Sequence, residues 1–248
     1  MAQDAPRVRL HVDQPLGPGQ CVALTEAQAH YLFGVMRLAP GDAVTLFNSR
    51  DGEWRATVAE AARRRGTLAC TAQTGPLRLP PDVWLLFAPL KKTRTDFIVE
   101  KAAELGVRRI LPVATEFTGA ERINRDRLQA HAVEAAEQCG GTYVPEVAPL
   151  APLSRLLEGW DPARRLMWCD ESRAGQPVAL DGPPGPWAIL TGPEGGFSPA
   201  ERSRLAALPF SVPVSLGPRI LRADTAAVAA LTLWQLQCGD WGGDWGAG

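Results

Sequence analysis

From Val83 onward, short apolar runs alternate with stretches of helical periodicity, and this alternation constrains the fold more than any other feature. The runs are too short for helices and are bounded by turn residues, so they are predicted to be strands buried on both faces. Strands that alternate with helices build parallel sheets with right-handed crossovers. The predicted strands are VWLLFAPL, RILPVA, LMWC, WAIL and VPVSL.

Helices are predicted between these strands. The first is capped by Thr95 or Asp96 and ends at Gly106, a residue type that tolerates the left-handed conformation after a helix. Its expected apolar stripe is Phe97, Ile98, Ala102 and Leu105. Further helices are predicted over 125–139, from Ser198, and from about Asp224.

Residues 7–73 have a different pattern, with short β-prone runs separated by glycine-rich and proline-rich turns. A short helix is predicted over Glu26–Arg37, with Thr25 as its cap. The proline-containing stretch 74–82 is predicted to be a stiff linker. We therefore expect two domains, residues 1–76 and residues 80–248.

Composition excludes several classes of function. The chain has 248 residues with a formal net charge of -1, so no global field attracts nucleic acid or membrane. Its five cysteines form no C-x-x-C pair and its three histidines are scattered, which argues against disulfides, metal sites and Ser-His-Asp chemistry. The first residues lack the apolar core of a signal peptide, and no apolar run is long enough to span a bilayer. A cytoplasmic location is expected.

Ligands of open parallel sheets bind at the carboxyl ends of the strands, and three such ends carry unusual loops. They are KKTRTD after the first strand, GPEGGF after WAIL, and GPRILRADT after VPVSL. GPEGGF lacks the lysine and hydroxyl residue of a phosphate loop, and Glu194 would repel a phosphate. Its glycines leave room for a flat ring, so a nucleoside or amino-acid-like ligand is favoured. A plain strand–helix connector is the alternative interpretation.

The other two loops carry cations. In GPRILRADT, Arg219 and Arg222 flank Ile220 and Leu221, an apolar pair that could line an adenine slot. One of these arginines could equally be a solvated surface residue. The two glycine turns would form one cleft if their strands were neighbours. KKTRTD places three cations in one turn, a pattern typical of a solvated turn, and its place at a strand end raises the odds of an anion site.

The order of these motifs resembles that of one family. LKKTRTDFIVEKAAELGV, LTGPEGGFSPAE and SLGPRILRADTA are similar to motifs of the RsmE family, small-subunit ribosomal RNA methyltransferases of the SPOUT class. HYLFGVMRLAPGDAVTLF resembles the PUA-like barrel with which that family begins. The resemblance covers nearly the whole chain.

The resemblance implies an α/β protein in which a small N-terminal PUA-like β-barrel precedes a SPOUT α/β domain with a trefoil knot. It implies methyl transfer from S-adenosylmethionine to N3 of one uridine in the 16S rRNA of the small ribosomal subunit. It also implies a homodimer. The alternatives are a SPOUT methyltransferase acting on tRNA and a non-catalytic RNA-binding adaptor.

The resemblance also assigns residues, motif by motif. The cofactor-binding candidates are Leu190, Gly192, Glu194, Gly195, Gly196, Leu216, Gly217, Ile220 and Leu221. Arg222 is the catalytic candidate at the reacting uracil. The RNA-binding candidates come from their own positions, as cations beside the apolar strands of the first domain or at the first strand end of the second, and are Arg7, Arg9, Arg37, Lys91, Lys92 and Arg94. Two positions depart from the usual motifs: Asp224, where the family often has glutamate, and Gly141, where it often has arginine.

The expected chemistry follows from the acceptor atom. N3 of uracil carries a proton, which must leave before this nitrogen can accept a methyl group. A guanidinium near O2 or O4 would stabilise the charge that develops, and we assign this role to Arg222. Asp224, Glu194 and water remain as alternative proton acceptors.

Overall fold

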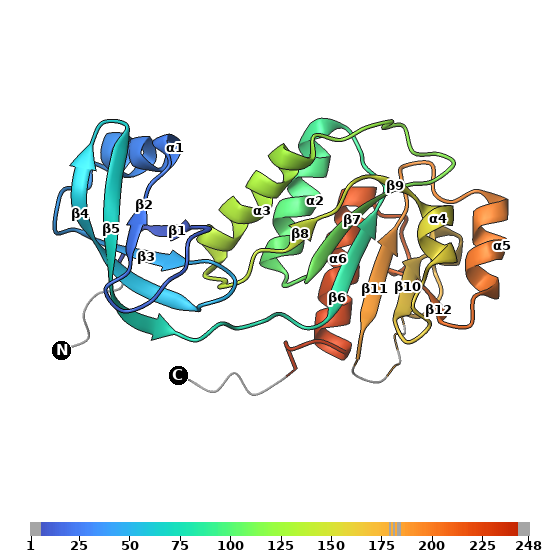
Figure 1. Ribbon diagram of the computed structural model, residues 1–248. Coiled ribbons are helices and arrows are strands. Elements are labelled where there is room, and N and C mark those ends of the chain that lie inside the picture. Colours follow the sequence, from blue (N-terminus) through green and yellow to red (C-terminus); the bar gives the residue numbers. More distant parts are fainter. Residues whose placement is uncertain (1–5, 179, 181, 183–184, 243–248) are drawn as a thin grey trace. The chain divides into compact units, whose positions relative to one another are not determined.

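The computed structural model describes residues 6–178, 180, 182 and 185–242, and the chain divides into two compact units (Figure 1). The first unit contains Met1–Leu79 and Ala136–Val144, and the second contains Pro80–Ala135 and Pro145–Gly248. The division at Leu79 falls inside the stretch expected to be a linker. The inclusion of residues 136–144 in the first unit was not expected from the sequence.

The first unit is built on a five-stranded sheet with the strand order β1-β3-β4-β5-β2. β1 is parallel to β3, and the other neighbouring strands are antiparallel. The first six residues of β4, Glu53 to Val58, alternate between half-buried and buried, as expected where one face covers a core. The strands are β1 (Arg9–His11), β2 (Cys21–Ala23), β3 (Ala43–Phe47), β4 (Glu53–Ala62) and β5 (Arg65–Gly75).

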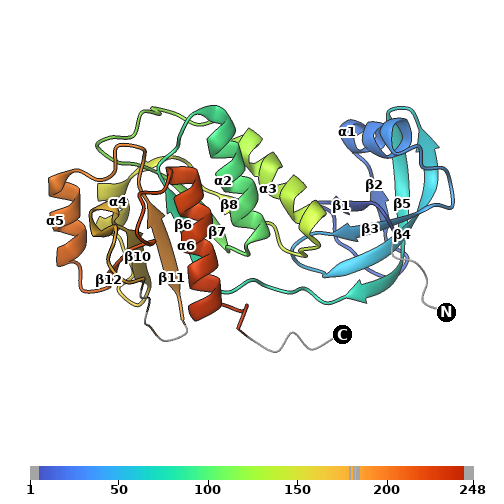
Figure 2. The same ribbon diagram turned by 180° about the vertical axis from the view of Figure 1, so that it is seen from behind.

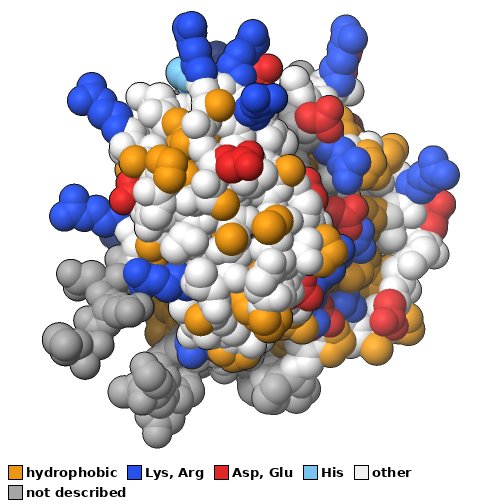
Figure 3. All heavy atoms as spheres, turned by 60° about the vertical axis from the view of Figure 1, so that its left-hand side comes forward, with side chains coloured by type: hydrophobic (Ala, Val, Ile, Leu, Met, Phe, Trp, Pro, Cys, Tyr) orange, Lys and Arg blue, Asp and Glu red, His pale blue; other side chains and the backbone are white. Residues whose placement is uncertain are grey.

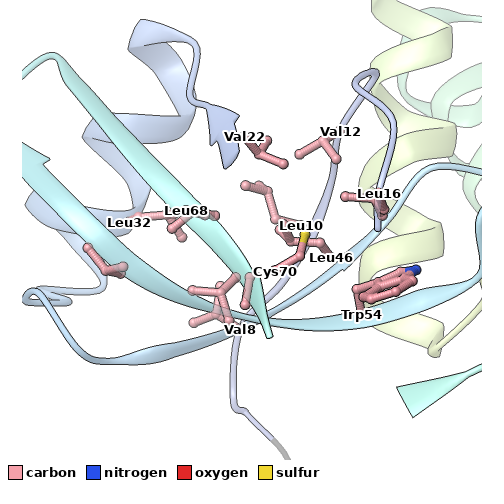
Figure 4. Close-up of a cluster of buried hydrophobic side chains, with 13 residues drawn as sticks. Val8, Leu10, Val12, Leu16, Val22, Leu32, Leu46, Trp54, Leu68 and Cys70 are labelled. Atoms are coloured by element: carbon pink, nitrogen blue, oxygen red, sulfur yellow. The ribbon is translucent and has the colours of Figure 1, made fainter. Parts of the chain in front are cut away.

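The core of the first unit is a cluster of aliphatic side chains with one tryptophan (Figure 4). Val22, Leu46 and Leu68 come from three different strands and have no exposed surface. Trp54 also packs here, and its indole nitrogen donates to the carbonyl oxygen of Asp51 at 2.8 Å. Each fully buried side chain of this size contributes roughly 1.5–3 kcal/mol, so this cluster is enough to hold the short strands together.

The predicted helix over Glu26–Arg37 is present but changes its winding. α1 (Glu26–Ala29) begins with the expected Thr25 cap, as part of a capping box with Gln28. It continues as a π-helical segment, η1 (His30–Val35). Arg37 then has a φ of 58°, a left-handed conformation that stops the helical winding.

Residues 136–144 are hydrogen-bonded to strands and turns of the first unit. Glu137 Oε1 accepts from the amide of His11 at 2.8 Å. Ser49 Oγ accepts from the amide of Val144 at 2.9 Å. These partners are far apart in sequence, which explains why local patterns gave no sign of the association.

The second unit contains a parallel sheet with the order β12-β10-β11-β6-β7-β8, and β9 pairs with β7 (Figures 1 and 2). Every described strand pair in it is parallel, as the strand–helix alternation predicted. The strands are β6 (Val83–Phe87), β7 (Arg109–Ala114), β8 (Glu146–Val147), β9 (Ala151–Pro152), β10 (Arg165–Cys169), β11 (Trp187–Thr191) and β12 (Ser211–Val214).

Helices cover both faces of this sheet (Figures 1 and 2). On one face, α2 and α6 pack against each other, and Gln235 Nε2 of α6 donates to the carbonyl oxygen of Leu105 at 2.6 Å. On the other face, Leu153 and Leu157 of α4 join Leu205 of α5 in a core with alternate strand residues. The helices are α2 (Lys92–Glu104), α3 (Arg125–Cys139), α4 (Leu153–Glu158), α5 (Pro199–Ala207) and α6 (Ala223–Gln237), and η2 (Glu171–Arg173) is a single 3₁₀ turn.

The predicted start of α2 is wrong. The helix begins at Lys92, and Lys91 is its cap residue. Thr95 is buried within the first turn, where its Oγ1 accepts from the amide of Leu90 at 2.9 Å and donates to the carbonyl oxygen of Leu90 at 3.0 Å. Its hydroxyl therefore secures the end of the preceding strand segment and does not cap the helix. Phe97, expected on the buried stripe, is 39% exposed.

Other helix predictions are confirmed. α3 covers Arg125–Cys139 as expected, and α5 follows the Ser198 capping box. α6 begins at Ala223, one residue before the expected position, and buries a stripe of small and large apolar side chains against its neighbours. Within the described residues, no helix is both long enough and apolar enough to span a membrane.

Candidate active site

The carboxyl ends of β12, β10 and β11 lie side by side, because β10 lies between the other two strands. A cavity of about 290 Å³ opens where these three strands end. It is lined by the loops that follow them and by the start of α6. The two strands that precede the glycine turns are not neighbours, because β10 separates them, yet both turns line this one cavity.

The loop after β11, residues 192–197, is called the glycine loop below. Gly196 has a φ of 69°, and a Cβ atom there would overlap the carboxylate of Glu171. A Cβ atom on Gly192 would lie 3.1 Å from the ring of Phe197, which is itself buried. Glycine is therefore favoured at 196 by its positive φ and the contact with Glu171, and at 192 by the contact with Phe197.

The glycine loop ends at a firmly capped helix. Ser198 Oγ accepts from the amide of Glu201 at 3.2 Å, and Glu201 Oε2 accepts from the amide of Ser198 at 2.9 Å. Glu201 Oε1 also accepts from the amide of Glu116 at 2.9 Å, which ties α5 to the segment after β7. These bonds hold the exit of the loop in one position.

The loop after β12 forms the apolar side of the cavity. Gly217 has a φ of 109°, and its amide donates to Ser215 Oγ at 3.2 Å, which closes a tight turn. Ile220 is 74% exposed, an unusual exposure for a large aliphatic side chain that suits contact with an apolar ligand ring. The apolar lining from this region is Val214, Leu216, Ile220 and Leu221.

The structure brings together most of the predicted cofactor-binding residues. Those that line the cavity are Gly192, Glu194, Gly196, Leu216, Gly217, Ile220 and Leu221. Leu190 lies instead in the core between the sheet and α4. Gly195 faces away from the cavity lining, and a Cβ atom there would lie 3.2 Å from Cβ of Phe117.

A third wall of the cavity was not predicted. It is the end of β10 with the segment after it, residues 170–174, called the acidic loop below. Asp170 and Glu171 line the cavity beside Cys169, whose pKa burial raises to about 12. The sequence did carry a signal for this wall, because two acidic residues directly follow the LMWC strand. Ligands bind at the carboxyl ends of parallel strands, the rule that also selected the glycine loop.

Each acidic wall of the cavity is held by an arginine. Arg94 Nη1 of α2 donates to Glu194 Oε1 at 2.9 Å, and its Nε lies 3.9 Å from Asp224 Oδ2. Both candidate proton acceptors therefore contact the same guanidinium. On the other side of the cavity, Arg202 of α5 pairs with Asp170 and Glu171.

Arg222, the catalytic candidate, occupies a different environment. It lines the cavity, is exposed, and is the cap residue from which α6 begins. Among the described residues, no carboxylate lies close enough to pair with it. An unpaired guanidinium at a helix N-terminus is suited to binding a negatively charged group.

The RNA-binding candidates of the first unit differ in exposure. Arg7 and Arg37 are exposed, whereas Arg9 is half-buried, pairs with Glu53, and donates from Nη2 to the carbonyl oxygen of Gly141 at 2.8 Å. Gly141 thus contributes its backbone at the position where the family often has arginine. Figure 3, turned toward the first unit, shows Lys and Arg side chains projecting at several separate places.

The RNA-binding candidates of the second unit lie at the start of α2. Lys91 and Lys92 are exposed, and Arg94 is half-buried against Glu194. KKTRTD is therefore the first turn of a helix that is joined to the cavity by one of its own cations. In the part of the chain that the structure describes, no group of three His, Cys, Asp or Glu side chains is placed to bind a metal ion.

Comparison with known proteins defines the class. The family model of the RNA methyltransferase domain matches residues 77–235, and the family model of the RNA methyltransferase PUA domain matches residues 24–68. The first match includes the parallel sheet and the whole cavity. The fold and the cavity are those of an RNA methyltransferase.

Individual relatives identify the family within this class. The ribosomal RNA small subunit methyltransferase E of Synechocystis sp. is 34% identical over 217 residues, 85% of this chain and 71% of that protein. The crystal structure of the Neisseria gonorrhoeae enzyme of the same name, bound to S-adenosyl methionine, is 28% identical with a TM-score of 0.86, over 94% of this chain and 99% of that one. A putative methyltransferase of Legionella pneumophila in complex with the same cofactor has a TM-score of 0.82 at 27% identity, over 95% and 100% of the two chains. The chain belongs to the ribosomal RNA small subunit methyltransferase E family.

Proposed function

We propose that the protein transfers the methyl group of S-adenosylmethionine to N3 of a specific uridine in 16S rRNA. The observation that carries this proposal is the cavity at the ends of β10, β11 and β12. It combines glycine loops with carboxylates and an apolar slot, and its volume is near the lower end for small-molecule sites. Two neighbours of the same fold were solved with this cofactor bound.

The residues present fit such a cofactor. S-adenosylmethionine supplies an activated methyl group on a sulfonium cation and carries no phosphate, so carboxylates in its site are tolerated. The apolar slot of Leu216, Ile220 and Leu221 would hold the adenine ring. Backbone around Gly192 and Gly196 would approach the ligand closely, because neither residue has a side chain in the way.

Arg222 would act on the reacting base. It lies on the cavity and has no carboxylate partner among the described residues, so its guanidinium is available to O2 or O4 of uracil. Its charge would favour the uracil anion once the N3 proton has left. Glu194, which lines the cavity, and Asp224, which does not, are the proposed proton acceptors beside water, and both contact Arg94.

The fold also supports proposals about the domains, the knot and the oligomeric state. We propose residues 1–76 as a PUA-like β-barrel that binds RNA and residues 80–248 as a SPOUT domain with a trefoil knot. β11 lies between β10 and β6, two strands that precede it in the chain, and this order is compatible with a knot. Exposed Phe97 and Leu236 on neighbouring helices support a homodimer. We place the protein in the cytoplasm, where small subunits are assembled.

The test is a chemical map of the product. Small-subunit rRNA from a deletion strain should lack one methylated uridine, and the purified protein with cofactor should restore it on isolated small subunits. Mass mapping that finds the missing methyl group on tRNA would favour the rival SPOUT activity. A protein that binds RNA but has no measurable affinity for the cofactor would be an adaptor.

A further inference from the structure

The acidic loop is held in place by a single arginine that bonds to two loops at once. Arg202 Nε donates to the carbonyl oxygen of Phe197 at 3.0 Å, in the glycine loop. Its Nη1 donates to Asp170 Oδ1 at 3.2 Å, and its Nη2 donates to Glu171 Oε1. A planar guanidinium can make these bonds together, whereas a lysine ammonium has no fork of this shape.

Further bonds join the acidic loop and the residue after it to the end of β12 and the loop that follows. The amide of Asp170 donates to the carbonyl oxygen of Val214 at 3.2 Å, and the amide of Gly175 donates to the carbonyl oxygen of Gly217 at 3.0 Å. Asp170 Oδ1 also accepts from the amide and the hydroxyl of Ser172. Oδ1 of Asp170 is therefore engaged within the loop and with Arg202, while Glu171 uses one oxygen for Arg202.

Glu171 stands at the centre of the cavity wall. Its carboxylate lies directly against Gly196, where a Cβ atom would overlap it. Its side chain is 30% exposed, and among the described residues the only bond recorded for it is the one through Oε1. The second oxygen is left to accept a hydrogen bond from a ligand in the cavity.

The position and charge of Glu171 identify which part of the ligand it meets. Adenine is assigned to the apolar slot after β12, and the glycine loop with Glu194 lies after β11. β10 lies between these strands, so its loop faces the middle of a ligand that extends from one to the other. In a methyl donor of this kind the middle is the ribose. Because Arg202 already neutralises Glu171, the free oxygen suits neutral hydroxyl donors.

We propose that Glu171, positioned by Arg202, binds the ribose hydroxyls of the methyl donor. This rests on the proposed function, because it assumes that the cavity holds an adenosyl cofactor. Glu171 contacts the ligand, and Arg202 acts only through Glu171 and the glycine loop.

The first test compares ligands by calorimetry. S-adenosylhomocysteine and 5′-methylthioadenosine both keep the ribose diol, whereas S-(2′,3′-dideoxyadenosyl)homocysteine lacks it. Glu171→Gln should weaken binding of the first two by about 10-fold each and leave binding of the dideoxy ligand unchanged. An equal loss for all three ligands would overturn the ribose contact. A loss for S-adenosylhomocysteine alone would also overturn it, because the carboxylate would then meet the amino-acid part.

The second test separates positioning from general stability. Arg202→Met should weaken binding of S-adenosylhomocysteine by about 10-fold in the wild-type background and by less than about 2-fold when Glu171 is already glutamine. Arg202→Lys should fall between the wild type and Arg202→Met. Arg204→Met is the matched control, since Arg204 lies on the same helix and contacts Ser154 and Glu158 instead of the cavity.

Each outcome has a separate meaning. Equal losses from Arg202→Met in both backgrounds would show a structural role and overturn the positioning role. If the wild-type protein binds none of the three ligands, the cofactor assignment itself fails, and the proposed function fails with it. Normal wild-type affinity with unaffected variants would overturn only the role of Glu171 and Arg202.

Discussion

The glycine loop and the acidic loop line the same cavity in opposite ways. The glycine loop approaches with its backbone, and its two critical glycines are packed against Phe197 and Glu171. The acidic loop approaches with side chains, whose orientation depends on Arg202. A wall made of backbone tolerates no added atoms, whereas a wall made of side chains depends on the groups that orient them.

This difference decides which wall can be recognised from sequence. Glycine in a strand-to-helix turn marks a close approach of backbone, and this signal is local. Asp170 and Glu171 look like any solvated acidic pair until Arg202, more than 30 positions later, is seen to bond to them. Their function depends on a long-range contact.

The largest expected effect comes from adding one carbon to the backbone wall. Gly196→Ala should lower affinity for S-adenosylmethionine by at least about 100-fold, because the residue has a positive φ and its Cβ would overlap Glu171. Calorimetry gives the affinity, and Gly175→Ala is a control with positive φ and nothing within 4 Å. A loss of affinity as small as that of Gly175→Ala would contradict this prediction.

The second effect concerns neither loop. Arg222→Ala should slow single-turnover methyl transfer by about 100-fold while cofactor and RNA binding change little, because its charge matters only as the uracil anion forms. Arg222→Lys should restore little activity, since an ammonium cannot present a planar fork. Transfer at the wild-type rate in Arg222→Ala would place Arg222 among the phosphate contacts, and Arg219→Ala is the neighbouring control.

A smaller effect tests the arginine that holds the glycine loop. Lys92→Ala with Arg94→Ala should weaken RNA binding by about 10-fold and flatten its salt dependence by about one to two units. Arg94→Ala alone should weaken RNA binding less than Lys92→Ala alone, because Arg94 already pairs with Glu194. Filter binding across a salt series measures both quantities. Equal contributions from the two residues would show that the Arg94–Glu194 pair has no effect on RNA binding.

The smallest effect tests the exit of the glycine loop. Ser198→Ala should lower the free energy of unfolding by about 1 kcal/mol, since it removes the cap of α5. Thr25→Ala removes the equivalent cap of α1 in the first unit and should cost a similar amount. Only Ser198→Ala should also weaken cofactor binding, which calorimetry would detect. If both substitutions weakened cofactor binding equally, the weakening would reflect overall stability and not the position of the glycine loop.

Local signals predicted much of the second unit. Gly140 follows α3 with a positive φ, and Ser198 caps α5, so both helices are where the sequence placed them. The ends of β10, β11 and β12 were also predicted closely, and with them most of the cavity, whereas β8 and β9 were not predicted.

What could not be predicted depends on distant contacts. The position of β10 between β11 and β12 is set by pairing between strands far apart in the chain. Thr95 has the residue type of a cap, yet its hydroxyl bonds to Leu90 within a buried turn. The π-helical winding after Ala29 likewise has no signature in the motif that begins the helix.

The buried thiol of Cys169 has a consequence for the survival of the proposed methyl donor. A methyl sulfonium is an alkylating agent, and a thiolate is the side chain most easily alkylated by one. Cys169 lines the cavity, but burial raises its pKa to about 12, so at neutral pH it stays a protonated, poorly nucleophilic thiol. We therefore expect the burial of Cys169 to slow methylation of its own thiol.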